Sequence, residues 1–206
     1  MRIIFMGTPI FALPSLEKIY KEHEVIAVFT KVDKPNARGK TINYSPIKEF
    51  ALANNLKIYQ PENFKDEALI EEIRNMQPDL IVVVAYGKIL PKEIIDIPKY
   101  GVINLHSSLL PRFRGAAPIN AAIINGDKKS GVSIMYVEEE LDAGAVILQE
   151  ETKITDEDTF LSLHDRLKDM GADDITFYFR KDKFSQIEFS ENMGGDIIIN
   201  TTPVGM

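Results

Sequence analysis

The stretch Asp79-Leu80-Ile81-Val82-Val83-Val84-Ala85 decides the fold class of this chain. It is almost wholly apolar, because every residue from Leu80 to Ala85 is aliphatic. A run of this kind is typical of a strand that is buried on both faces of a parallel sheet. Parallel strands need helices on both faces of the sheet, so this stretch indicates an α/β protein.

The segments on either side of this stretch alternate between strand and helix signals. Pro14 suits a first helical turn, and Ser45 before Pro46 is a typical N-cap. The alternation predicts a doubly wound, mostly parallel sheet. The other predicted strands are Ile3–Met6, Val25–Thr30, Ile58–Tyr59, Gly101–Asn104, Val132–Val137 and Ala145–Gln149. The predicted helices are Pro14–Tyr20, Ile47–Asn54, Glu67–Asn75, Ala117–Asn125 and Thr159–Met170.

The composition is that of a folded globular protein. The chain has 206 residues, of which 45% are hydrophobic, and no cysteine, which excludes disulfides, thiolate metal sites and a catalytic thiol. Its longest apolar runs are far shorter than the ~20 residues that span a bilayer. The start at Met1 leads directly into a strand, without the pattern of a signal peptide. We therefore expect a cytoplasmic monomer with no membrane partner.

The charge is distributed unevenly along the chain. The net charge of −7 argues against a protein that coats nucleic acid non-specifically. Residues 31–48 nevertheless carry five basic side chains and one acid, Asp33. Pro35, Gly39 and Pro46 indicate that this stretch is a loop. The charge run by itself is more typical of a solvated loop than of a binding surface.

Three predicted strand ends carry polar or glycine-rich sequence: residues 7–9, 85–88 and 104–108. Ligands of open α/β sheets bind beyond the carboxyl ends of the strands. Asn104 and His106 are two residues apart, so both point to the same face of an extended strand. An amide can donate to a developing oxyanion, and an imidazole can move a proton near neutral pH, as acyl or formyl transfer requires. The alternative is that His106 is a hydrogen-bonded structural residue.

Asp142 is the candidate for a third group that orients the imidazole or passes on a proton. It follows one predicted strand and precedes another, within Leu141-Asp142-Ala143-Gly144. Asp close to Gly is also common in turns, so a turn role stays open. The acidic run Glu138–Glu140 before it is interpreted as solvated, although nearby like charges can raise the pKa of a carboxyl group.

Four motifs in this order closely resemble the catalytic domain of the methionyl-tRNA formyltransferases. They are Phe5-Met6-Gly7-Thr8-Pro9, Asn104-Leu105-His106-Ser107-Ser108-Leu109-Leu110-Pro111, Arg114-Gly115-Ala116-Ala117-Pro118-Ile119 and Leu141-Asp142-Ala143-Gly144. The resemblance covers residues 1 to about 170. The basic stretch 31–48 of this chain also resembles the corresponding loop of the family. It implies a formyltransferase Rossmann-like fold and transfer of a formyl group from 10-formyltetrahydrofolate to methionyl-tRNA.

The resemblance also implies a role for particular residues. The catalytic triplet corresponds to Asn104, His106 and Asp142. The folate pocket corresponds to Tyr86, Gly87, Ile89, Leu90, Ser108, Leu109, Leu110 and Pro111. The initiator methionyl-tRNA is expected to contact the basic loop 31–48, and the residues implied in tRNA binding are Lys34, Arg38, Lys40 and Arg114. No metal is implied.

Some features depart from the family pattern. Ile10 stands where the family usually has an acid, and Ala121 where an aromatic residue is common. The family's C-terminal barrel domain is not found in the sequence. The alternatives are therefore a truncated or chimeric product that keeps the folate pocket with little activity, or a glycinamide ribonucleotide formyltransferase-like activity. The segment 114–119 and the basic loop favour the tRNA branch.

Residues 171–206 are interpreted as an appended β-containing tail. Asn200-Thr201-Thr202-Pro203-Val204-Gly205-Met206 resembles a signature of shikimate dehydrogenases, in which the position of Arg180 reads the NADP 2′-phosphate. Strands are predicted over Ile175–Arg180 and Asp196–Thr202. No glycine-rich turn precedes the helix predicted over Thr159–Met170, so no pyrophosphate site is expected there. We therefore expect that the tail does not bind NADP.

Overall fold

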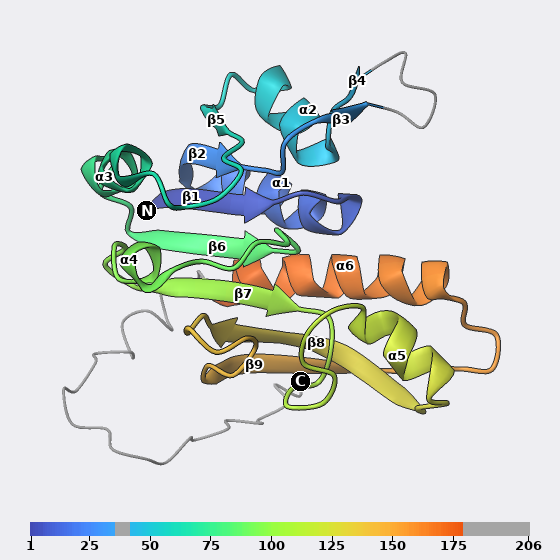
Figure 1. Cartoon of the computed structure of the whole chain (residues 1–206). Coiled ribbons are helices and arrows are strands. Elements are labelled where there is room, and N and C mark those ends of the chain that lie inside the picture. Colours follow the sequence, from blue (N-terminus) through green and yellow to red (C-terminus); the bar gives the residue numbers. More distant parts are fainter. Residues whose placement is uncertain (36–41, 179–206) are drawn as a thin grey trace.

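The protein is described by a computed structural model covering residues 1–35 and 42–178. Within these residues a seven-stranded sheet has the order β5-β2-β1-β6-β7-β8-β9 (Figure 1). Its strands are β1 (Arg2–Gly7), β2 (Glu24–Phe29), β5 (Ile58–Tyr59), β6 (Leu80–Val84), β7 (Val102–His106), β8 (Lys129–Tyr136) and β9 (Val146–Lys153). The first five strands in the sheet order are parallel, whereas β8 and β9 each pair antiparallel with their neighbour. The predicted α/β class and mostly parallel sheet are confirmed.

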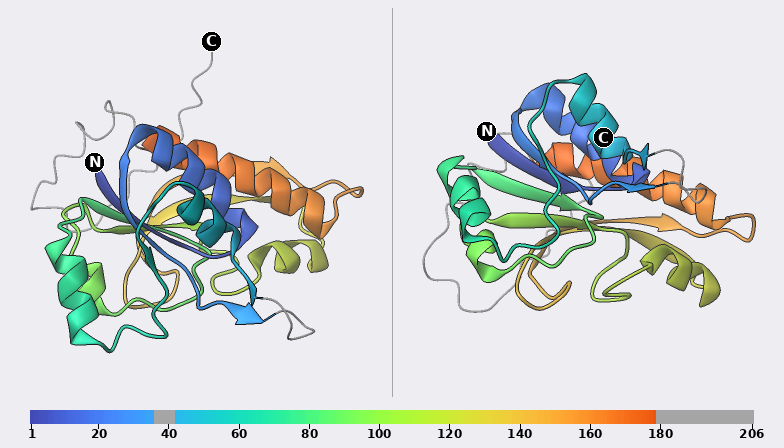
Figure 2. Two further views of the ribbon diagram at one scale, coloured as in Figure 1. Left: turned by 90° about the horizontal axis from the view of Figure 1, so that it is seen from above. Right: turned by 45° about the horizontal axis from the view of Figure 1, so that its top comes forward.

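Helices cover both faces of the sheet (Figure 2). They are the short 3₁₀ helix η1 (Ile10–Ala12), followed by α1 (Leu13–Glu22), α2 (Pro46–Ala53), α3 (Glu67–Asn75), α4 (Lys92–Ile95), α5 (Pro118–Ile124) and α6 (Phe160–Tyr178). A separate antiparallel pair, β3 (Lys34–Pro35) and β4 (Ile42–Asn43), lies outside the main sheet. The predicted N-cap is confirmed, because the Ser45 hydroxyl accepts a hydrogen bond from the Lys48 amide at 3.1 Å.

The sheet separates two hydrophobic cores, because successive strand residues point to opposite faces. On β1, Ile3 and Phe5 belong to the core beneath α1, α2 and α6, whereas Ile4 and Met6 belong to the core beneath α3 and α4. All four side chains are fully buried. The stretch from Leu80 to Val84 contributes to both cores, which is why it is apolar throughout.

The strand predicted over Ile175–Arg180 is wrong as far as the structure describes it. Residues up to Tyr178 continue helix α6, whose predicted end was Met170. Leu163, Leu167, Ile175 and Tyr178 are all buried, and their spacing follows the helical period. The β-branched and aromatic residues of this segment favour a strand by local propensity, but packing against the sheet outweighs that preference. The position of Arg180 and the strand predicted over Asp196–Thr202 lie outside the described residues.

Candidate active site

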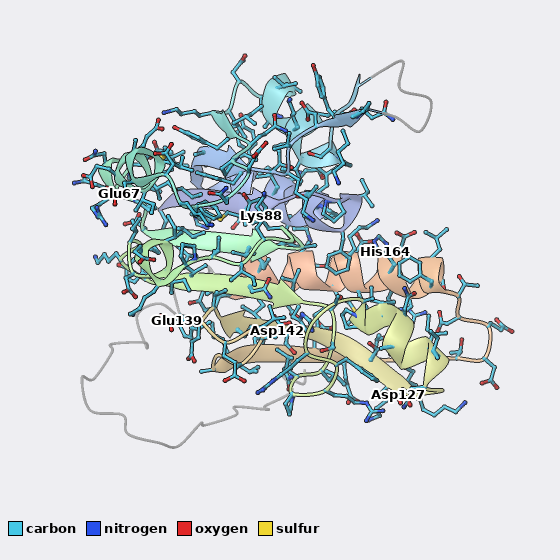
Figure 3. The ribbon with its side chains drawn as sticks, in the orientation of Figure 1. Glu67, Lys88, Asp127, Glu139, Asp142 and His164 are labelled. Carbon is cyan, nitrogen blue, oxygen red and sulfur yellow. The ribbon has the colours of Figure 1, made fainter. Side chains whose placement is uncertain are left out.

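One cavity of about 640 Å³ opens at the carboxyl ends of β1, β6 and β7. Its walls come from the segments that follow these strands, from the loop between β8 and β9, and from the first turns of α5 and α6. This is the edge at which an open α/β sheet binds ligands. Figure 3 shows three residues that line the cavity: Lys88 and Asp142 on two different loops, and His164 on helix α6.

Asn104 and His106 lie at the carboxyl end of β7, and both line the cavity. His106 Nε2 lies 2.9 Å from the Phe113 carbonyl oxygen. Because a carbonyl oxygen can only accept, Nε2 carries the proton and donates it to this bond. The other nitrogen, Nδ1, lies 3.7 Å from Asp142 Oδ2. Nδ1 is therefore the nitrogen that is free to take a proton, with a carboxylate close by.

The Asp142 side chain is held near His106 by the backbone of the loop before α5. Its Oδ2 accepts a hydrogen bond of 2.8 Å from the Gly115 amide. The side chains of His106 and Asp142 are only 8% and 10% exposed, which places the pair in a largely desolvated setting. The 3.7 Å separation is longer than a hydrogen bond, and such contacts often tighten only when substrate is bound.

The backbone around the cavity is strained. Ala85, Phe113, Ala117 and Asp142 all have φ between 47° and 57°, a region that non-glycine residues rarely adopt. Ala85, Ala117 and Asp142 line the cavity, and Phe113 accepts the hydrogen bond from His106. Strain of this kind persists where the surrounding structure holds the backbone, and it is concentrated at functional sites.

Asn104 completes a group that is suited to acyl transfer. The residue is half-buried, and its side-chain amide makes no hydrogen bond to any residue within the described ranges. The cavity thus contains a free amide donor, an imidazole nitrogen and a carboxylate. An amide donor can stabilise an oxyanion, while the imidazole and the carboxylate can share the accompanying proton.

The loop after β6 places Tyr86, Gly87, Ile89 and Leu90 in the cavity wall. Burial raises the pKa of the Tyr86 phenol, so this group is neutral at physiological pH. A Cβ atom placed on Gly87, which has a φ of 73°, would lie 2.3 Å from Lys31 Nζ. The Lys31 ammonium group therefore lies directly against this loop.

The other predicted pocket segment, 108–111, lies behind the cavity and is not among the residues that line it. The Ser108 hydroxyl donates to the Arg112 carbonyl at 2.6 Å, and the Ser108 carbonyl accepts from Ser133 Oγ at 2.6 Å. The Leu110 amide donates to the same Ser133 hydroxyl at 3.1 Å. These bonds brace the loop that carries Phe113, so this segment supports His106 from behind. Leu109 and Pro111 belong to the same braced loop.

The described part of the basic loop is only partly available to a polyanion. Lys34 is exposed on β3, whereas Lys48 pairs with Asp33 and donates to Gln60 Oε1 at 2.8 Å. Burial opposes ionisation of Asp33, but hydrogen bonds from Lys48 and Gln60 outweigh it and lower the pKa of this carboxyl group. Arg38 and Lys40 lie outside the described residues.

Arg114 lies on the loop before α5, outside the cavity lining. Its side chain is 46% exposed, and Nη1 lies 3.8 Å from Glu140 Oε1. An ion pair this exposed contributes little to stability. Arg114 can therefore exchange Glu140 for another anion at small cost.

Sequence reasoning missed the aromatic end of the cavity. Phe11, Phe160 and His164 line it from η1 and α6. The one signal in the sequence was Phe160, a large apolar residue in the first turn of the helix predicted over Thr159–Met170. Ile10 and Ala121, the two departures from the family pattern, lie on η1 and α5 and are not among the lining residues.

Residues 1–35 and 42–178 contain no group of three or more His, Asp or Glu side chains that could hold a metal ion. None of the helices within those same ranges is long and apolar enough to cross a membrane.

The fold and the site define an α/β protein with an acyl-transfer constellation at the carboxyl edge of its sheet. The family model described as "Formyl transferase" matches residues 1–176. The chain therefore belongs to the formyl transferase family, and the match reaches beyond residue 170, where the sequence analysis ended the resemblance.

Two relatives in the sequence comparison carry the same name. A methionyl-tRNA formyltransferase of Fusobacterium nucleatum is 91% identical over 173 residues, covering 84% of this chain and 56% of the relative. One from Clostridium tetani is 55% identical over 174 residues, with the same two coverages of 84% and 56%. The chain thus spans little more than half the length of these curated relatives.

Solved structures show the same fold at low sequence identity. A phosphoribosylglycinamide formyltransferase from Bacillus halodurans superposes with a TM-score of 0.72 at 22% identity, covering 88% of this chain and 97% of that one. This likeness confirms the Rossmann-like architecture of the formyltransferases.

Proposed function

We propose that this chain transfers a formyl group from 10-formyltetrahydrofolate to the amino group of methionyl-tRNA. The observation that carries the proposal is the meeting of Asn104, His106 and Asp142 in one cavity. The names of the relatives support the choice of acceptor, since both are methionyl-tRNA formyltransferases. The fold alone does not discriminate between acceptors.

The residues around the cavity suit each step of this reaction. The acceptor amine attacks the formyl carbon, a C–N bond forms, and the carbonyl electrons move to oxygen. The Asn104 amide donates a hydrogen bond to this oxyanion. His106 Nδ1 takes the proton that the amine loses, and Asp142 stabilises the resulting imidazolium from 3.7 Å. The C–N10 bond then breaks, and the proton passes to N10 of the departing folate.

The donor is proposed to bind on the side of the cavity formed by the loop after β6. Tyr86, Gly87, Ile89 and Leu90 line that side. Ile89 is 77% exposed although it is apolar, so its side chain is available to cover an aromatic ring of the donor. The segment 108–111 is proposed to act indirectly, by holding the loop that positions His106.

The tRNA is proposed to bind through the cations Lys34, Arg38, Lys40 and Arg114. Phosphate contacts of this kind supply affinity and salt dependence, with little contribution to the chemical step. The net charge of −7 makes such a local basic surface necessary for a polyanionic partner.

The test is single-turnover formylation with saturating 10-formyltetrahydrofolate and initiator methionyl-tRNA. We expect N-formylmethionyl-tRNA from the wild-type chain and a loss of roughly 10²–10⁴-fold in the rate of His106→Ala. The same assay with glycinamide ribonucleotide as acceptor should yield no product. If the wild-type chain binds the folate but forms no product with either acceptor, the proposal is wrong and the chain is a folate-binding fragment.

A further inference from the structure

The buried face of helix α6 carries one carboxyl group among apolar side chains. Leu167, Ile175 and Tyr178 are buried at helical spacing, and Asp174 lies on the same face. Asp174 is 9% exposed, and its Oδ2 atom has no hydrogen-bond partner within residues 1–35 and 42–178. It does not line the active-site cavity, so the proposed chemistry does not use it. A carboxyl group buried in this way costs free energy unless it is neutral or paired.

The group that faces Asp174 is a second carboxyl, that of Glu150. Glu150 lies on the edge strand β9, within hydrogen-bonding reach of Asp174. Two ionised carboxylates are acceptors only and repel each other, so a hydrogen bond between them requires that one of them holds a proton. Because Asp174 is buried and Glu150 is exposed, the proton resides on Asp174. Burial, followed by the hydrogen bond and the charge of Glu150, raises the pKa of Asp174 to about 7.

The other groups around Asp174 do not compensate a negative charge on it. On the same helix Asp173 adds a further negative charge, and Lys18 of α1 pairs with Asp173. From β8 comes Tyr136, which hydrogen-bonds with Tyr178 one turn further along α6. The elements η1 and α5, which also pack against α6, have no ionisable side chain. An ionised Asp174 would therefore face only Glu150 and Asp173, which are both acidic.

From this geometry we propose that Asp174 and Glu150 form a pH-sensitive clasp between helix α6 and the edge strand β9. The shared proton holds residues 172–178 of α6 against the sheet, and its loss to solvent releases them. Once the proton has left, two carboxylates face each other with no donor between them, and Asp174 regains its hydration only when the helix end moves away from the sheet. The proposal goes beyond formyl transfer, and its tests do not use that reaction.

The raised pKa fixes the direction of the pH dependence. Asp174 has a pKa of about 7 when α6 is docked and its ordinary value of 3.8 when it is released. The stability that the clasp contributes is therefore fully present below about pH 4 and is lost as the pH rises through 7. Each pH unit within this window changes the docking equilibrium about tenfold. Because the loss ends near pH 7, the equilibrium should fall about tenfold in total between pH 6 and pH 8.

The first test is amide hydrogen exchange measured by NMR at pH 6 and pH 8, with each rate divided by the intrinsic rate at that pH. In the wild-type chain, protection of the amides of residues 175–178 should fall about tenfold. In Asp174→Asn the side-chain amide can donate to Glu150 at either pH, so protection should differ by less than about twofold. The matched control is Asp169→Asn, which removes an exposed carboxyl group from the same helix and should keep the tenfold fall. Equal protection of the wild-type chain at both pH values, or a tenfold fall that persists in Asp174→Asn, would overturn the proposal.

A second measurement needs no variant of Asp174. The carboxyl ¹³C shifts of Asp174 and Glu150 in the wild-type chain should both report the loss of one proton with a midpoint near pH 7. Glu150→Gln removes the facing charge and should move the Asp174 midpoint to lower pH. If both wild-type groups titrate near about pH 4, the value of ordinary carboxyl groups, or if the Asp174 midpoint is unchanged in Glu150→Gln, the two carboxyls share no proton and the proposal is wrong.

Discussion

Replacing Asp142 with Asn tests how much the carboxylate contributes to the reaction. The substitution preserves size and keeps an oxygen that can accept the Gly115 hydrogen bond, now 2.8 Å long. It removes the negative charge that lies 3.7 Å from His106 Nδ1. Only the interaction with a positively charged imidazole is lost, and that charge develops during the reaction.

The size of the effect follows from the geometry. Two unit charges at this distance interact with about 4 kcal/mol at an effective dielectric constant of about 20. Each 1.36 kcal/mol corresponds to about tenfold in rate, so the full interaction amounts to roughly 10³-fold. Solvent in the open part of the cavity offsets some of this energy. We therefore expect the Asp142→Asn rate to fall about 10²–10³-fold.

The assay is single-turnover formylation at saturating donor and acceptor, combined with urea unfolding of each variant. The free energy of unfolding should change by less than about 1.5 kcal/mol, because the Gly115 bond survives in neutral form. Glu140→Gln is the matched control: it removes a charge from the same loop, but Glu140 is 79% exposed and does not line the cavity. A rate loss below tenfold in a folded Asp142→Asn variant, or an equal loss in the control, would refute the electrostatic role.

Three further predictions concern tRNA binding, stability and loop geometry. Changing Arg38 and Lys40 together to Ala should reduce the slope of log affinity against log salt by about 1.4–1.8 in filter-binding titrations, and an unchanged slope would place the tRNA contact elsewhere. Hydrogen bonds from a backbone amide and from neighbouring hydroxyl and guanidinium groups hold the pKa of Asp158 at about 2, below its ordinary value of 3.8. The stability that this depressed pKa contributes is present above about pH 4 and is lost as the pH falls through 2. The melting temperatures of the wild-type chain and of Asp158→Asn should therefore converge in that pH range. A Cβ on Gly144 would lie 2.0 Å from the Tyr136 carbonyl oxygen. Gly144→Ala should therefore displace the Asp142 loop and lower the formylation rate about 10²-fold. Normal activity of this variant would show that the loop adapts.

The sequence predicted most of the fold because its signals are local. The aliphatic run from Leu80 to Val84 is typical of a strand buried on both faces, and the structure places it in the middle of the sheet. Helix α3 was predicted with its observed bounds, Glu67–Asn75. The segment after Met170 shows the limit of this reasoning. Its β-branched and aromatic residues favour a strand locally, whereas α6 continues through them because their helical face is buried against the sheet.

The sequence by itself determined which residues can do chemistry at the site and from which strand end they project. The alternation along β7 was enough to place Asn104 beside His106, because side chains two residues apart on a strand share a face. What only the tertiary structure decided were the contacts between distant segments. Three features depend on how separate loops pack. They are the approach of Asp142 to His106, the proton on Nε2 that faces Phe113, and the position of residues 108–111 behind the cavity. The aromatic end of the cavity could not be predicted for the same reason. η1 and α6 lie about 150 residues apart in the chain and meet only when the sheet brings them together. Packing between distant elements, unlike strand or helix formation, leaves no periodic pattern in the sequence.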